Sequence, residues 1–384
     1  MSPSGKVALI HDWLTGMRGG EKCLEAFCEL FPDADLFTLI YLPDRVSRTI
    51  RGMKVQASWI NQLPGIRHYY RYCLPFFPGA IERFNLETYD LVVSSSHCVA
   101  KGILPRGALH IAYIHSPMRY IWDQHDAYFG ADASWIPSAG MTLWRNYLQQ
   151  WDRRSSDRVN CFIANSNNTA SKVKTLYGHE ATVIHPPVDV DRFDLHEHQE
   201  PYYLIVSALV PYKKIDIAVE AFNRLKLPLK IAGDGPMRKK LEKMAHPNVE
   251  FIGWVDDQAL PALYASCQAL IFPGEEDFGI VPLEAQASGR PVIAYGKGGA
   301  LESVLPLNRT ENAQPTGIFF SELTADSVME AVRVFHDNRQ MFEPDAIRRH
   351  ARRFSRSRFK AQIADYIEAY CKTPSGEVAD VKAL

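Results

Sequence analysis

Two glutamates, Glu276 and Glu284, flank a short Phe-Gly segment in a spacing that suits the binding of a hydroxyl-rich ligand. An apolar run at 269–272 precedes them, and a helical pattern started by Pro282 follows. This predicts a strand, a loop and a helix, with the acids at the strand's carboxyl end, where open α/β sheets bind ligands. Ionised carboxylates accept strong hydrogen bonds from sugar hydroxyl groups. The spacing alone is equally compatible with a solvated loop in which one acid caps the following helix and binds no ligand.

Basic residues follow another apolar run of the same half of the chain. Lys213 and Lys214 lie between the run at 203–207 and a helical pattern at 216–225, which places them at the carboxyl end of a strand. Cations at that edge suit a diphosphate, although they also fit a solvated helix start. Gly233 follows the run at 229–232 without the G-x-G-x-x-G spacing, so no dinucleotide site is predicted.

Three further candidate groups lie at strand ends in the first half of the chain. Arg18, Gly19, Gly20 and Glu21 end the first loop, with a helix predicted to start at Glu21; glycine backbone and a helix N-terminus suit phosphate. His115 follows the run at 110–114, together with Arg119 a few residues on. Two more polar side chains follow the run at 161–164: Asn165 and Ser166. For the loop that ends at Glu21, the alternative is a tight turn that binds no ligand. For His115, the alternative is a purely structural role.

Alternating strands and helices must position these residues, and the alternation occurs twice. Strands are predicted at 6–11, 90–94, 110–114, 161–164 and 182–184, and again at 203–207, 229–232, 249–252, 269–272 and 292–295. Helices fall between them, including 21–31, 216–225 and 235–244. The fold class is therefore α/β, with two Rossmann-like doubly wound domains facing a cleft. The predicted division is 1–195, 196–357 and a helix with a tail at 358–384.

The acids, the Ala-rich helix after them and the segments Gly289-Arg290-Pro291 and Gly298-Gly299 resemble known enzymes. They are similar to the retaining, nucleotide-sugar-dependent glycosyltransferases of family four, which have the GT-B fold. The likeness runs in order from Val7 to Phe320 and includes bacterial mannosyltransferases of O-antigen and exopolysaccharide synthesis. It implies that the C-terminal helix crosses back to the first domain.

The resemblance also implies roles for residues. Glu276 would bind hydroxyls of the transferred sugar, His115 would reach toward it, and Lys213 would hold the diphosphate; these three form the predicted catalytic set. The predicted donor-binding residues are Gly19, Gly20, Lys213, Lys214, Phe278, Gly279, Ile280, Glu284 and Gly233, with Glu284 on the ribose. The predicted acceptor-binding residues are Arg18, Arg119, Asn165 and Ser166. Ala208 stands where the family has an arginine, which puts one of two diphosphate contacts in doubt.

The implied reaction is transfer of a hexose, with GDP-mannose as the favoured donor, to a hydroxyl of a glycan or polyprenyl-linked acceptor. Retention would proceed by front-face displacement, because no carboxylate matches a double-displacement nucleophile. No cofactor and no metal are expected. An NDP-sugar 2-epimerase on the same fold, or a non-catalytic carbohydrate-binding subunit, are the alternatives.

Composition sets outer limits on these expectations. The 384 residues suffice for two domains, and a net charge of −1 argues against a nucleic-acid binder. Seven scattered cysteines without a C-x-x-C pair fit a reducing compartment, and no signal peptide or membrane span is read, so a cytoplasmic location is expected. Aromatic residues alternate with arginines over residues 59–84, which suits peripheral contact with an anionic membrane or a packed helical insert.

Overall fold

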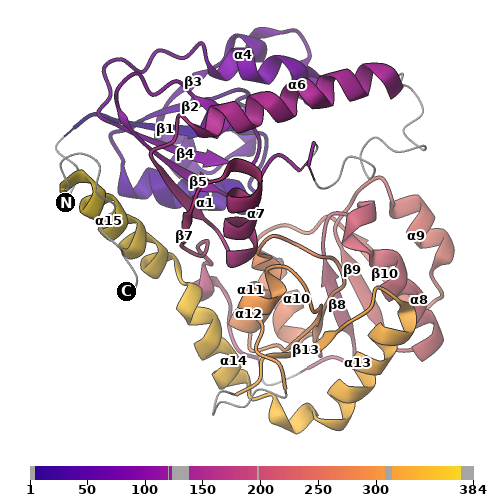
Figure 1. Cartoon of the computed structure of the whole chain (residues 1–384). Coiled ribbons are helices and arrows are strands. Elements are labelled where there is room, and N and C mark those ends of the chain that lie inside the picture. Colours follow the sequence, from indigo (N-terminus) through magenta and orange to yellow (C-terminus); the bar gives the residue numbers. More distant parts are fainter. Residues whose placement is uncertain (1–4, 120, 123–137, 197–198, 308–313, 373–384) are drawn as a thin grey trace. The chain divides into compact units, whose positions relative to one another are not determined.

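The computed structural model describes residues 5–119, 121–122, 138–196, 199–307 and 314–372 (Figure 1). The described chain divides into two compact units, and each is considered by itself. The first unit comprises residues up to His115, Tyr147–Ile163 and those from Ser357 onward. The second comprises Ser116–Asn146 and Ala164–Arg356, so the division passes through a strand at Ile163. The predicted tail at 373–384 lies outside the described residues.

The first sheet has seven strands in the order β3-β2-β1-β4-β5-β6-β7. Its pairings β2–β3, β1–β2, β1–β4 and β4–β5 are all parallel. The chain leaves β1 toward one edge and returns to β4 on its other side, which is the switch point of a doubly wound fold. The strands are β1 (Val7–His11), β2 (Asp35–Thr38), β3 (Lys54–Ala57), β4 (Leu91–Ser96), β5 (Leu109–Ile114), β6 (Cys161–Ala164) and β7 (Ala181–Val183).

Helices of the first unit cover this sheet, and the C-terminal helix is one of them. The Phe359 ring on α15 (Arg356–Lys372) lies 5.4 Å from that of Phe27 and 5.7 Å from that of Tyr113. The predicted return of the last helix to the first domain is therefore confirmed. The other helical segments of the first half are α1 (Gly19–Leu30), η1 (Pro43–Arg45), α2 (Arg48–Gly52), η2 (Trp59–Gln62), α3 (Ile66–Tyr69), η3 (Tyr70–Phe76), α4 (Phe77–Ile81), η4 (Ala100–Gly102), α6 (Ser138–Ser156) and α7 (Asn167–Tyr177).

The second sheet has six strands in the order β10-β9-β8-β11-β12-β13, and all its pairings are parallel. The strands are β8 (Tyr203–Val206), β9 (Leu229–Ala232), β10 (Val249–Gly253), β11 (Leu270–Phe272), β12 (Val292–Tyr295) and β13 (Gly317–Phe320). Alternate side chains of β11 and β12 enter two separate cores: Ile271 and Ile293 face one, Leu270 and Val292 the other. Because both faces of these two strands are covered, they are apolar throughout.

Helices pack on both faces of the second sheet. The core with Ile271 is closed by α8 (Ile215–Leu225), α9 (Arg238–Met244) and α13 (Ala325–Asp337). The core with Leu270 is closed by α10 (Leu260–Ser266), α11 (Ile280–Ala287), α12 (Ala300–Ser303) and α14 (Pro344–Ala351). The predicted architecture of two Rossmann-like doubly wound domains is confirmed.

Details of the elements differ from the sequence prediction. The helix after the acids begins at Ile280 instead of Pro282, and α1 begins at Gly19 instead of Glu21. The helix predicted from residue 235 begins at Arg238, because residues 233–237 form a turn against the end of β8. Strands β2, β3 and β13 are absent from the sequence prediction, and β3 alternates between exposed and half-buried positions.

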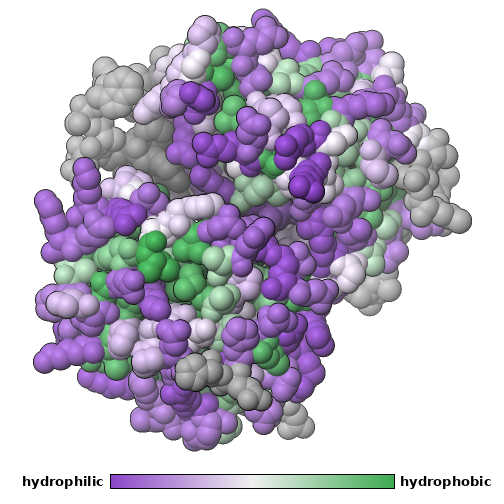
Figure 2. Space-filling model, turned by 180° about the vertical axis from the view of Figure 1, so that it is seen from behind, coloured by the Kyte–Doolittle hydropathy of each residue, from purple (hydrophilic) through white to green (hydrophobic). Residues whose placement is uncertain are grey.

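The surface seen in Figure 2 is mainly hydrophilic, with hydrophobic residues gathered in separate patches. In the described part of the chain, no helix has the length and apolar character needed to cross a bilayer. The six cysteines with described side chains are buried thiols.

Candidate active site

The loops after β8 and β11 bring two of the predicted site residues together. Lys213, on the short η6 segment (Pro211–Lys213) after β8, forms an ion pair with Glu276 in the loop after β11. The Lys213 side chain is 12% exposed and that of Glu276 20%. Since β8 and β11 are neighbours in a parallel sheet, their carboxyl ends meet at one edge, and the two opposite charges lie side by side there.

The remaining acid of the pattern lies deeper. Glu284, on α11, is 7% exposed, and one of its carboxylate oxygens accepts a hydrogen bond of 2.9 Å from the Tyr264 hydroxyl. Burial, with the nearby Glu284 charge, raises the pKa of Tyr264 well above its ordinary value, so this hydroxyl keeps its proton and donates. Lys214, beside Lys213, adopts a left-handed backbone with φ of 53° and ends η6.

Between the two acids, the loop is shaped by aromatic packing. The Phe278 side chain is buried and stacks on the His185 ring at a centroid distance of 5.2 Å. Gly279 has φ of 88°, a conformation that a side chain disfavours, and Ile280 then starts α11. The predicted backbone donors Phe278, Gly279 and Ile280 thus form the entry to the helix.

The glycine-rich segment at 296–299 braces this loop. The Gly299 amide donates a hydrogen bond of 2.8 Å to the Glu276 carbonyl oxygen. A Cβ atom on Gly299 would lie only 2.1 Å from the Phe278 Cα, so no other residue fits there without movement of the loop. Farther on, Glu302 accepts from the Asn167 and Asn168 amides at the start of α7. The segment therefore holds the Glu276 backbone in place.

Asp277 is the centre of a buried charge network that sequence reasoning missed. Its carboxylate is 3% exposed and accepts hydrogen bonds from Arg119 (2.5 and 2.8 Å), Lys172 (2.8 Å) and Asn168 (3.1 Å). Burial alone would raise the pKa of Asp277, but the Arg119 and Lys172 charges hold it below its ordinary value. Arg119, predicted for the acceptor side, is thus bound to the loop that carries Glu276. No signal in the sequence pairs these distant residues.

Gly233 lies at the end of β9, in contact with the end of β8. Its amide donates to the Gly253 carbonyl oxygen at 2.6 Å, and a Cβ atom would lie 1.9 Å from the Ser207 carbonyl oxygen. Only glycine allows this approach of two strand ends. Ala208, the position where the resemblance leads one to expect an arginine, follows Ser207 and is exposed.

In the first unit, His115 belongs to a cluster of buried and half-buried polar rings. Its Nε2 lies 2.8 Å from the Ser95 hydroxyl, and that hydroxyl lies 3.1 Å from Nδ1 of His11. Burial, with the nearby His97, lowers the pKa of His11 to about 3, so His11 is neutral. A Cβ atom on Gly20 would lie 3.6 Å from the His11 ring and 3.8 Å from the His115 ring. The glycine therefore lies directly against both histidines.

A buried aspartate shapes the turn beside this cluster. The Asp12 carboxylate accepts four backbone amides, from residues 97 to 100, at 2.6–3.0 Å, and His97 Nδ1 lies 3.1 Å away. Four amide donors satisfy a buried carboxylate without a cation. The turn after β4 is thereby fixed beside β1.

The first loop is closed by its own glutamate. Glu21 is 4% exposed and accepts a hydrogen bond of 3.1 Å from the Arg18 amide, and burial raises its pKa to about 7. Gly19 and Gly20 form the first two residues of α1. Arg18 precedes them and is exposed.

Asn165 and Ser166 lie at the end of β6, in the second unit. The Ser166 hydroxyl is fully buried and accepts a hydrogen bond of 3.0 Å from the Thr169 amide, which caps α7. The Asn165 carbonyl oxygen lies 3.1 Å from His185 Nδ1. These contacts are those of a helix cap, and an acceptor role for the pair stays a prediction.

The structure thus gathers the predicted residues in two groups. Lys213, Lys214, Gly233, Glu276, Phe278, Gly279, Ile280, Glu284, Arg119, Asn165 and Ser166 belong to the second unit, and Arg18, Gly19, Gly20 and His115 to the first. Across the described ranges, no three His, Cys, Asp or Glu side chains are arranged to hold a metal ion.

Two family models match the chain in succession. The model described as Glycosyltransferase Family 4 matches residues 19–192, and the one described as Glycosyl transferases group 1 matches residues 188–354. The first match covers Gly19, Gly20 and His115, and the second covers Lys213, Glu276 and Glu284. All predicted site residues except Arg18 therefore lie within family regions.

Curated relatives and solved structures agree with these matches. O-antigen chain mannosyltransferase C of Escherichia coli is 29% identical over 35% of this chain and 42% of its own length. A GDP-mannose-dependent alpha-(1-6)-phosphatidylinositol monomannoside mannosyltransferase of Mycobacterium tuberculosis is 31% identical over 47% of this chain and 53% of its own length. The chain thus spans about half the length of these relatives.

Sucrose-phosphate synthase from Thermosynechococcus elongatus shares the fold. The two structures superimpose with a TM-score of 0.73 over 96% of this chain and 100% of that chain, at 17% identity. With two doubly wound sheets and two successive family matches, the chain belongs to the family-four glycosyltransferases of the GT-B fold.

Proposed function

We propose that the protein transfers a hexose from a nucleotide sugar to a hydroxyl group of a glycan or lipid-linked acceptor, with retention of configuration. The observation that carries this proposal is the pairing of Lys213 with Glu276 at the ends of adjacent strands. A diphosphate needs the cation and a hexose needs the acid, so one edge of the sheet supplies both. GDP-mannose is the favoured donor, because the two curated relatives are named as mannosyltransferases.

The residue roles in this proposal come from the family resemblance, and the positions and burial of the residues support them. Lys213, assisted by Lys214, binds the donor diphosphate, and Glu276 accepts hydrogen bonds from the hexose. Glu284, held by Tyr264, binds the ribose hydroxyls. The amides at the entry to α11 (Phe278, Gly279 and Ile280) complete the donor contacts, and Gly233 leaves room near the base.

The chemical step is a front-face displacement. The acceptor oxygen forms a bond to the anomeric carbon while the bond from that carbon to the diphosphate oxygen breaks. The departing diphosphate takes the acceptor's proton, and His115 contacts the sugar at this stage. Lys213 stabilises the charge that develops on the leaving group, so no metal is required.

A second cation compensates for Ala208 in this proposal. Arg119 lies close enough to Glu276 and Tyr212 to interact with them electrostatically, in addition to its bond with Asp277. Its guanidinium group therefore lies beside the loop that carries Glu276, the ion-pair partner of Lys213. We assign to it the leaving-group contact that Ala208 does not provide.

The proposal includes peripheral contact with the inner face of an anionic membrane. Three aromatic side chains of the 59–84 segment are exposed: Trp59 by 39%, Tyr72 by 60% and Phe76 by 57%. The Arg83 guanidinium lies 5.7 Å from the Trp59 ring centroid. Exposed rings beside arginines suit the headgroup region of a bilayer.

Product analysis separates this function from the two alternatives. Incubation with the donor alone gives an epimer if the protein is a 2-epimerase, whereas a transferase gives a glycoside only when an acceptor is added. A non-catalytic carbohydrate-binding subunit gives neither product.

EDTA is expected to leave the rate of transfer unchanged.

The decisive experiment compares two neighbouring glutamates. Glu276→Gln removes the charge that we assign to the hexose, while Glu275→Gln removes an exposed charge one residue away. We expect Glu276→Gln to lower kcat/KM for transfer by about a hundredfold, corresponding to about 3 kcal/mol, and Glu275→Gln to have little effect. Equal activity of both variants would remove the sugar-binding role of Glu276.

A further inference from the structure

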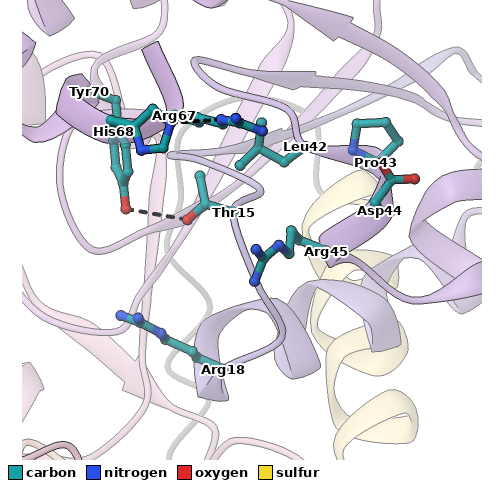
Figure 3. Close-up of a pocket in the computed structure, with 9 residues that line it drawn as sticks. All are labelled: Thr15, Arg18, Leu42, Pro43, Asp44, Arg45, Arg67, His68 and Tyr70. Atoms are coloured by element: carbon teal, nitrogen blue, oxygen red, sulfur yellow. Dashed lines mark hydrogen bonds between the residues drawn. The ribbon is translucent and has the colours of Figure 1, made fainter. Parts of the chain in front are cut away.

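A cavity of about 570 Å³ lies in the first unit, and its wall is rich in arginine (Figure 3). Three separate segments form it: the loop after β1, the segment after β2 that includes η1, and the α3–η3 region. The lining residues are Thr15, Arg18, Leu42, Pro43, Asp44, Arg45, Arg67, His68 and Tyr70. We call this cavity the arginine pocket.

The charges of the arginine pocket are not balanced. It contains three arginines and one aspartate. Arg18 interacts electrostatically with Glu21, whereas Arg45 and Arg67 form no ion pair with a carboxylate of the described residues. Arg67 Nε donates a hydrogen bond of 2.8 Å to His68 Nε2. Like charges held in one cavity repel one another, and a bound anion would relieve that repulsion.

Hydroxyl groups lie between the arginines. Thr15 Oγ1 lies 3.3 Å from the Tyr70 hydroxyl, and Figure 3 shows Arg18, Arg45 and Arg67 around this pair. Guanidinium forks and hydroxyl groups are both donors to anionic oxygens. A carboxylate is satisfied by one fork, whereas a phosphoryl group offers three strong acceptor oxygens. Three arginines therefore fit a phosphoryl group best.

We propose that the arginine pocket binds a phosphoryl group, as a phosphate or a diphosphate, carried by the acceptor. That an acceptor carries the phosphoryl group rests on the proposed function, whereas the binding of an anion in this pocket does not. The pocket volume exceeds that of a phosphate, so the group that carries it also has room. The exposed Tyr72 and Phe76 lie on η3, the segment that begins at Tyr70, which favours a phosphoryl group at a lipid surface over a soluble one.

Protection from chemical modification tests the proposal on the intact protein. Phenylglyoxal modifies exposed arginines, and peptide mass spectrometry gives the rate at each residue. Arg48 and Arg51 serve as internal controls, because both are exposed on α2 and neither lines the pocket. The probes are inorganic pyrophosphate and vesicles of phosphatidylcholine with or without phosphatidic acid.

A probe at ten times its dissociation constant should slow the modification of Arg45 and Arg67 by about tenfold and leave the two control residues unchanged. Protection by phosphatidic acid vesicles alone identifies a lipid phosphate, and protection by pyrophosphate identifies a soluble phosphoryl group. Equal rates at Arg45 and Arg67 with and without both probes overturn the proposal, as does equal slowing of all four arginines.

Paired variants separate this inference from the proposed function. The double variant R45Q/R67Q should raise KM for a phosphoryl-bearing acceptor at least about tenfold over R48Q/R51Q, with the KM for the donor unchanged. If the protein transfers no sugar, the protection experiment still decides the anion site. If it transfers sugar and R45Q/R67Q behaves as its control does, only the anion site is wrong.

Discussion

The buried carboxyl group of Glu21 makes the stability of the first unit depend on pH. Burial raises the pKa of Glu21 from 4.5 to about 7 in the folded protein. Between those two values the folded state keeps a proton that the unfolded state releases. The free energy of unfolding therefore falls as pH rises from about 4.5 to 7, and it levels off above that range.

The size of this effect follows from the two pKa values. At 1.36 kcal/mol for each pKa unit, the difference between 4.5 and about 7 corresponds to about 3 kcal/mol. The variant Glu21→Gln keeps an oxygen for the Arg18 amide and carries no charge at any pH. It should match the parent protein at pH 4.5 and be more stable by about 3 kcal/mol at pH 8.

Hydrogen exchange of the peptide that covers α1 measures this locally, with variant and parent compared at the same pH. Glu29→Gln is the control on the same helix, since the Glu29 carboxylate is 33% exposed in its ion pair with Lys360. The control should change stability by less than about 1 kcal/mol at every pH. A Glu21→Gln variant whose difference from the parent stays constant between pH 5 and 8 would refute the reasoning.

Three other substitutions test separate parts of the structure. Asp277→Asn leaves two cations without their buried partner and should lower the stability of the second unit by about 3–5 kcal/mol in urea unfolding; a loss below about 1 kcal/mol would contradict a buried network. Ser95→Ala removes the hydroxyl group beside His115 Nε2 and should lower kcat about tenfold with the donor KM unchanged, whereas a change confined to KM would rule out positioning. Gly299→Ala forces Phe278 to move, so a loss of about 1–3 kcal/mol and weaker nucleotide binding are expected; unaltered melting and binding would show that the loop adapts freely.

The placement of Lys213 and Glu276 at one edge of the sheet was predictable because it depends on the order of strands. Lys213 and Glu276 each follow an apolar run, and a doubly wound sheet places such ends at one edge. Their direct contact needed one more fact, that β8 and β11 are neighbours. The resemblance and the alternating pattern together predicted the residues but not the ion pair.

The charge network of Asp277 could not be predicted in the same way. Arg119 and Lys172 are 158 and 105 residues away from Asp277 in the chain, and neither belongs to a periodic pattern that ends at the loop. The same is true of Asp12, whose four amide partners follow β4. Such contacts depend on where loops pack, which apolar periodicity does not determine. The arginine pocket escaped prediction for that reason, although Arg18 and the arginines of residues 59–84 were noted separately.

In the proposed reaction, the ion pair between Lys213 and Glu276 also affects product release. Each side chain serves as the counter-charge of the other, so a ligand that takes Lys213 leaves Glu276 without compensation unless it brings hydroxyl groups. A nucleotide sugar meets both demands, whereas the nucleotide left after transfer meets only one. Re-formation of the ion pair between Lys213 and Glu276 then competes with binding of the nucleotide product. This competition favours release of the nucleotide and restores the site for the next donor.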